Sequence, residues 1–143
     1  MRWKKGELSP GFLLLWALFF FLDQDGVAPW ALAACTVHEL AHVICLYLAG
    51  GRIKRIRFTA FGAEIEGQSW RRLSYGGELL SVLAGPGSNL MLAFLAARAG
   101  ERWYLFAGLN LSLGIFNLLP APGLDGGRAV RLLFLMLFEK REK

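Results

Sequence analysis

Histidine and cysteine are both scarce in this chain, whose 143 residues contain two of each. The cysteines, Cys35 and Cys45, lie in one apolar segment. Ten residues of helix would separate them by about 15 Å, which excludes a disulfide between them. We interpret them as small buried helix residues in preference to metal ligands.

The chain also lacks internal repeats, low-complexity linkers and a recognisable nucleic-acid-binding fold. Its formal net charge of +5 therefore does not indicate nucleic acid as a partner. The basic residues gather near the two ends and in one central segment, 52–72. Basic clusters that flank apolar segments are typical of membrane-topology signals. We therefore expect the lipid bilayer as a partner, and no nucleic acid.

Apolar segments dominate the rest of the chain. Hydrophobic residues make up 55% of it, and its mean hydropathy is +0.43. A spanning helix needs about 20 residues, so the second apolar segment is long enough to cross a bilayer and the first is short. The pattern predicts an all-α polytopic membrane protein of four to five apolar helices, forming a single domain over 1–143 with its core at about 27–128. We place the apolar segments at 8–22, 27–49, 79–97, 103–119 and 129–138.

Two features of these segments carry further expectations. Pro86 and its flanking glycines predict a kink in the third segment. The last segment leaves two possibilities open, because 126–138 could complete a span or lie along the membrane interface.

A short alternating pattern interrupts the apolar segments. Apolar and charged residues alternate over 53–58 and again over 63–66, with Gly62 between them. Alternation predicts two short strands, so we expect a small β-hairpin at the membrane surface. The alternative is an irregular basic loop. A hairpin there could accept an extended substrate segment as an added strand.

Basic residues also predict the orientation in the membrane. Arg2, Lys4 and Lys5 precede the first apolar segment, whereas the connection to the second carries only Asp23 and Asp25. The positive-inside rule then places the N-terminus, the hairpin and the C-terminus in the cytoplasm. The N-terminal part also resembles a secretory signal, but cleavage near 31–34 would cut the second segment. We therefore expect an uncleaved, multi-pass integral membrane protein.

The two histidines flank a glutamate, in the order His38, Glu39 and His42. Positions i and i+4 share one face of a helix, so both imidazoles can bind one metal ion. Glu39 follows the first ligand directly, where it can reach a metal-bound water without being a ligand itself. An ionisable group near the bilayer centre costs roughly 2.5 kcal/mol or more. The combination predicts a metalloprotease whose active site lies within the membrane.

A catalytic zinc usually takes three protein ligands and a water, so a third ligand is needed. With no further histidine, it must be acidic, thiol or amide, and Asp125 is the best candidate. It lies in an otherwise apolar region, between a break rich in proline and glycine and the pair Gly126-Gly127. Such a break would let the carboxylate face the second segment across a hydrated pocket. The alternative is an interfacial aspartate that caps the following helix.

These motifs resemble the site-2 protease family of intramembrane zinc metalloproteases. The likeness rests on HELAH at 38–42 and NLLPAPGLDGG at 117–127, with Gly85, Pro86 and Asn89 in the third segment. It is strongest to the compact bacterial branch, which includes a sporulation protease that processes a pro-sigma factor. No PDZ or CBS domain accompanies the motifs in this chain.

The resemblance implies a role for each of five residues. His38, His42 and Asp125 would bind one Zn²⁺ per chain, and Glu39 would be the catalytic base. Asn117 would help to stabilise the reacting carbonyl, although a helix-terminating residue that bonds to nearby backbone is an equally good interpretation of its position.

The implied function is cleavage, near the cytoplasmic face, of a transmembrane or membrane-associated protein. A pro-sigma or anti-sigma factor would be such a substrate, in a bacterial cell membrane, and a regulatory membrane protein is a further expected partner. Two rivals remain. One is a catalytically silent membrane scaffold, and the other is a protein that transports or senses metal.

Overall fold

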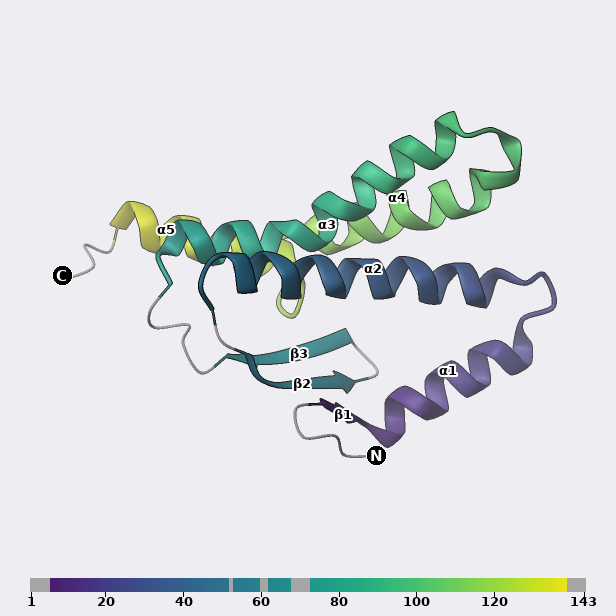
Figure 1. Cartoon of the computed structure of the whole chain (residues 1–143), viewed down its shortest axis with the longest axis horizontal. Coiled ribbons are helices and arrows are strands. Elements are labelled where there is room, and N and C mark those ends of the chain that lie inside the picture. The colour runs from purple at the N-terminus through teal and green to yellow at the C-terminus, as the bar shows by residue number, and fades with distance from the viewer. Residues whose placement is uncertain (1–5, 52, 60–61, 68–72, 139–143) are drawn as a thin grey trace.

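The described part of the chain is mostly helical and includes one small sheet (Figure 1). The computed structural model describes residues 6–51, 53–59, 62–67 and 73–138. The helices are α1 (Pro10–Leu22), α2 (Val27–Leu48), α3 (Tyr75–Arg98), the short 3-10 helix η2 (Glu101–Trp103), α4 (Tyr104–Leu118) and α5 (Asp125–Phe138); the strands are β1 (Gly6–Leu8), β2 (Ile53–Thr59) and β3 (Gly62–Gly67).

Local capping explains where the helices begin. Ser9 accepts a hydrogen bond from the Phe12 amide, and Pro10 occupies the first turn, so α1 starts two residues later than the apolar pattern predicts. The carboxylate of Asp23 accepts from the Val27 and Ala28 amides and so caps α2. Ser74 accepts from the Gly77 amide, which extends α3 four residues beyond the predicted start at 79.

The sheet has the order β1-β2-β3. β2 and β3 pair antiparallel over the residues for which the alternating pattern predicts a hairpin. β1 pairs with β2 in parallel, with Gly6 opposite Ile56 and Leu8 opposite Phe58. β1 was not predicted, because a three-residue strand is too short to give a detectable pattern.

Helices α2, α3 and α4 pack against one another, and α5 packs against the first part of α3. Small residues, among them Ala34, Ala93 and Ala107, are buried where these helices meet. Small side chains let helix backbones approach closely, which is how helices associate in lipid. α3 contains Pro86, and Figure 1 shows it changing direction partway along its length, as the sequence predicts.

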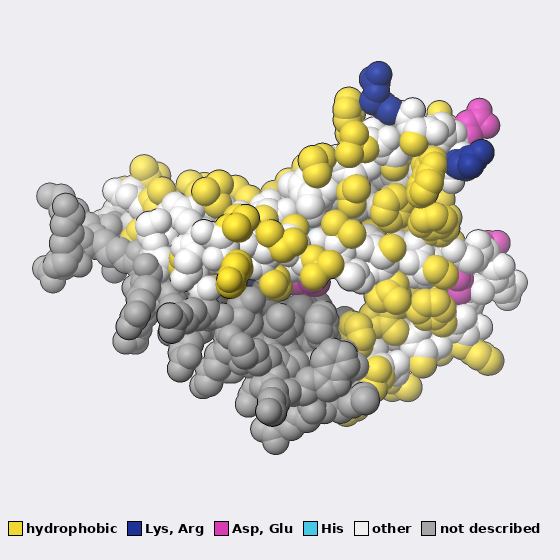
Figure 2. Space-filling model, in the orientation of Figure 1, with side chains coloured by type: hydrophobic (Ala, Val, Ile, Leu, Met, Phe, Trp, Pro, Cys, Tyr) yellow, Lys and Arg dark blue, Asp and Glu magenta, His cyan; other side chains and the backbone are white. Residues whose placement is uncertain are grey.

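Large apolar side chains cover the outside of the helices (Figure 2). By length and hydropathy, α2 and α3 are the described helices able to cross a membrane, whereas α1 is apolar but shorter. α5 begins at Asp125 and carries Arg128 and Arg131. It is therefore less apolar than the last segment of the sequence pattern, 129–138, suggests.

Candidate metal centre

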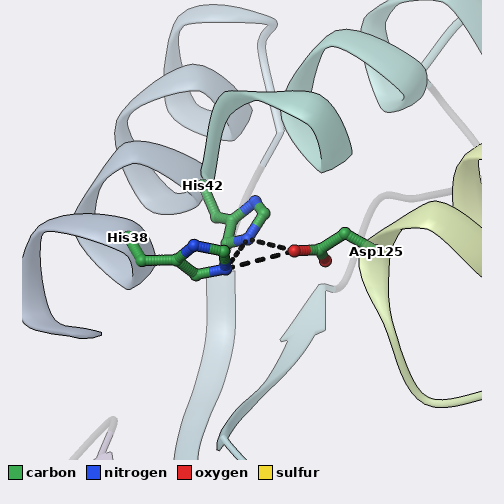
Figure 3. A group of neighbouring side chains, drawn as sticks. All are labelled: His38, His42 and Asp125. Carbon is green, nitrogen blue, oxygen red and sulfur yellow. Dashed lines mark hydrogen bonds and ion pairs between the residues drawn. The ribbon is translucent and has the colours of Figure 1, made fainter. Parts of the chain in front are cut away.

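The two histidines lie on one face of α2, one turn apart. Their Nε2 atoms are 3.0 Å from each other, and both rings point away from the helix toward the same point (Figure 3). The helical geometry alone explains this approach, because residues i and i+4 project from the same face.

Asp125 reaches the same point from the first turn of α5 (Figure 3). Its Oδ2 is 3.1 Å from His38 Nε2 and 3.2 Å from His42 Nε2. Two glycines that follow Asp125 allow the chain to turn this tightly. A Cβ at Gly126 would lie 2.1 Å from the carbonyl oxygen of Leu118, and a Cβ at Gly127 would lie 2.2 Å from that of Ala121.

The other ring nitrogens of the two histidines have acceptors of their own. His42 Nδ1 donates to the main-chain carbonyl of Ser81, at 2.7 Å. His38 Nδ1 donates to Oδ1 of Asn89, which is fully buried in α3. With the hydrogen of each ring on Nδ1, both Nε2 atoms carry a lone pair.

The three converging atoms are therefore all acceptors. At separations of 3.0–3.2 Å they repel one another unless a cation lies between them. A tetrahedral zinc with bonds of about 2.0–2.1 Å places its ligands roughly 3.3 Å apart, close to the separations seen. The side chains are only 7–12% exposed, so little water competes with a metal. The donor set of two imidazoles and one carboxylate fits zinc and leaves a fourth position open.

Gly85 of α3 faces the two imidazoles. A Cβ at this position would lie 2.2 Å from His42 Nε2 and 2.8 Å from His38 Nε2. Both distances are too short for any side chain. The backbone of α3 can therefore approach the metal site closely only because residue 85 is glycine.

Glu39 and Asn117 are the remaining site residues predicted from the sequence. Glu39 is half-buried on α2, next to His38. Asn117 lies in the last turn of α4 and donates to the carbonyl of Leu113, 3.0 Å away in its own helix. This is the backbone contact that the alternative interpretation of Asn117 describes, and it engages one of the two amide hydrogens. Cys35 and Cys45 are half-buried and lie outside the group of possible metal ligands found among the described residues.

Two polar contributors around the site were missed in the sequence, namely the carbonyl of Ser81 and the amide of Asn110. Asn89, which hydrogen-bonds to Asn110, was named only as part of the family pattern and was given no role. The signal available was an asparagine inside each of two apolar segments, since unpaired amides are costly in such surroundings. Their partners, however, lie on other helices.

The chain is similar to proteins that are named as zinc metalloproteases. A family model described as Peptidase family M50 matches residues 96–143. A Mycobacterium tuberculosis protein named zinc metalloprotease Rip3 is 32% identical over 90% of this chain and 36% of its own length. Stage IV sporulation protein FB of Bacillus subtilis is 33% identical over 68% of this chain, again 36% of its own length. The chain thus spans little more than a third of the curated relatives it matches.

A solved structure shows the same fold. The site-2 protease from Methanocaldococcus jannaschii superposes with a TM-score of 0.74, covering 93% of this chain and 68% of that protein at 23% identity. The family model covers Asp125 but not the two histidines, since its match begins at residue 96. The matches to Rip3 and to the archaeal structure cover at least 90% of this chain.

Proposed function

Because the chain belongs to the site-2 protease family, peptidase family M50, we propose that it is a zinc-dependent intramembrane endopeptidase. The observation that carries the proposal is the convergence of three acceptor atoms, from His38, His42 and Asp125, within 4.8 Å of one another. These residues would hold one zinc ion. Zinc bound there supplies Lewis-acid activation of a water molecule and of a peptide carbonyl.

The protein's own groups divide the remaining work. Glu39, adjacent to His38 on α2, takes a proton from the attacking water and returns it to the leaving amine. Asn117 uses the amide hydrogen that is not donated to Leu113 to stabilise the negative charge on the substrate oxygen. His38 and His42 keep their Nδ1 hydrogens throughout, because Oδ1 of Asn89 and the carbonyl of Ser81 accept them.

The depth of the site follows from its place on α2. If α2 spans the bilayer with its C-terminal end at the cytoplasmic face, His42 lies six residues from Leu48, about 9 Å from that end. His38 lies eleven residues from Val27, about 16 Å from the opposite end. Cleavage would then occur within the membrane and nearer to the cytoplasm. We place the N-terminus, the sheet and the C-terminus on that cytoplasmic side, in accordance with the positive-inside rule.

The proposed substrate is a transmembrane or membrane-associated protein, of the kind represented by pro-sigma and anti-sigma factors, in a bacterial cell membrane. A spanning helix hides its peptide bonds, so the substrate must be extended before attack. The sheet offers a template for this. Since β1 and β3 occupy the two sides of β2, an added strand would pair with the outer edge of β3 or of β1.

The substitution Glu39→Gln tests the function most directly. It keeps the size of the side chain and removes its ability to accept a proton, so zinc should stay bound while cleavage falls by about 10²–10⁴-fold. We would co-express the protein with a panel of single-span proteins that carry a tag on each side of the membrane, and follow loss of the full-length form. Cleavage by the variant at the wild-type rate would refute the proposal, and zinc flux into vesicles would favour a transporter.

A further inference from the structure

Two buried asparagine amides connect His38 to α4 through hydrogen bonds. Asn89 and Asn110 are both fully buried, and no other polar side chain of the described residues is as completely enclosed. Asn89 lies on α3 and Asn110 on α4, so the two amides connect α2, which carries His38, to α3 and α4. Buried amides in apolar surroundings are costly unless each group is paired, and here each has a partner.

Main-chain carbonyls determine the direction of the hydrogen bonds made by these two amides. The carbonyl of Phe106 can only accept, so Asn110 must donate to it through Nδ2, at 2.9 Å. Oδ1 of Asn110 then faces Nδ2 of Asn89, at 2.8 Å. A second carbonyl, that of Ala34, also accepts from Asn89 Nδ2, at 3.2 Å. Both contacts place the amide nitrogen of Asn89 away from His38.

The consequence is that Asn89 presents its oxygen to His38. An oxygen acceptor there requires the His38 ring to carry its hydrogen on Nδ1. Nε2 of the same ring is then left with its lone pair, directed at Asp125 and His42. A histidine that binds a metal usually donates its other N–H to a partner that fixes the tautomer and the ring orientation.

We propose that Asn89 and Asn110 are positioning residues that hold His38 in the tautomer with its hydrogen on Nδ1, and so keep Nε2 available as a metal ligand. The proposal rests on the proposed function for the identity of the metal, but the tautomer is a property of the metal-free protein. The two histidines differ in this respect. His42 depends on a main-chain carbonyl, which no side-chain substitution removes, whereas His38 depends on a relay of two side chains.

The test uses the fact that the chain has only two histidines. Histidine labelled with nitrogen-15 gives signals from two rings, and the couplings of each ring nitrogen report which one carries the hydrogen. In the full chain, in detergent micelles and without metal, both rings should carry it on Nδ1 when they are neutral. A wild-type spectrum with the His38 hydrogen on Nε2 would overturn the proposal without recourse to any variant.

Two variants then test the relay itself. Asn89→Leu removes the acceptor, so the tautomer of His38 should shift toward Nε2–H while His42 stays unchanged. Zinc affinity, measured by competition with a chelator, should fall by about 10–100-fold. Asn110→Leu leaves Asn89 held by Ala34 alone, so the same two effects should appear more weakly.

A matched control separates positioning from general loosening of the helix. Ser88→Ala removes the hydroxyl next to Asn89, whose hydrogen bond goes to the Gly85 carbonyl within α3. It should change neither the tautomer nor the zinc affinity. If Asn89→Leu lowers zinc affinity without changing the tautomer of His38, or if Asn110→Leu matches wild type in both measurements, the relay is wrong. Neither result depends on proteolysis, so failure here is distinguishable from failure of the proposed activity.

Discussion

Gly85 offers the sharpest test of how closely α3 approaches the two imidazoles. In Gly85→Ala, the new methyl would lie 2.2 Å from His42 Nε2, whereas ordinary contact begins at 3.4 Å. The His42 ring would therefore have to withdraw by about 1.2 Å. It cannot simply rotate away, because its Nδ1 is held by the Ser81 carbonyl. A misplacement of about 1 Å can cost 10²-fold in rate.

We therefore expect Gly85→Ala to lower cleavage by about 10²-fold. Zinc affinity should fall at least as far as it does on loss of an outer hydrogen-bond partner, about 10–100-fold. Competition with a chelator measures the affinity, and loss of a tagged single-span protein measures the cleavage. Gly87→Ala is the matched control, since it lies two residues further along the same helix and a Cβ there has no atom within 4 Å. Equal zinc affinity in the two variants would refute the close approach of α3 to the rings.

Two further predictions concern the α5 side of the site. Asp125→Ala leaves two ligands, fewer than the three protein groups of a typical catalytic zinc site, so zinc content should fall well below about one per chain. Metal analysis of the purified protein measures this, and Asp25→Ala, at an exposed position, is the control. An undiminished zinc content would remove Asp125 from the ligand set. Gly126→Ala places a Cβ 2.1 Å from the Leu118 carbonyl oxygen, so it should destabilise the fold by about 1–3 kcal/mol. Thermal unfolding in detergent should separate it from Gly108→Ala, which meets no atom within 4 Å; coincident curves would contradict the tight turn.

Local periodicity made much of this protein predictable. The pairing of His38 with His42 follows from helix geometry, which depends on neighbours along the chain only. The kink in α3 was predicted on similar grounds, because Pro86 acts on the backbone beside it. The boundaries were less accurate. Caps at Ser9 and Ser74, and the early start of α5 at Asp125, shifted the helix ends by a few residues.

Long-range contacts account for the features that were not predicted from the sequence. The strand β1 became visible only through its pairing with β2, some fifty residues away. Asn117 was given a catalytic role through resemblance, and the structure adds that one of its amide hydrogens goes to Leu113. That contact is compatible with either interpretation of the residue, so its catalytic role stays a prediction.

The sequence by itself indicated the chemistry proposed for the site, because two candidate metal ligands and a candidate general base are recognisable by residue type and by their spacing on one helix. It also indicated that the site lies in a membrane protein, since long apolar segments are typical of helices that cross a lipid bilayer. Only the tertiary structure decided how the site is held. The acceptor for each Nδ1, the bare backbone of Gly85 beside the rings, and the amide relay to α4 depend on how separate helices cross, and that crossing is decided by packing between residues distant in the chain.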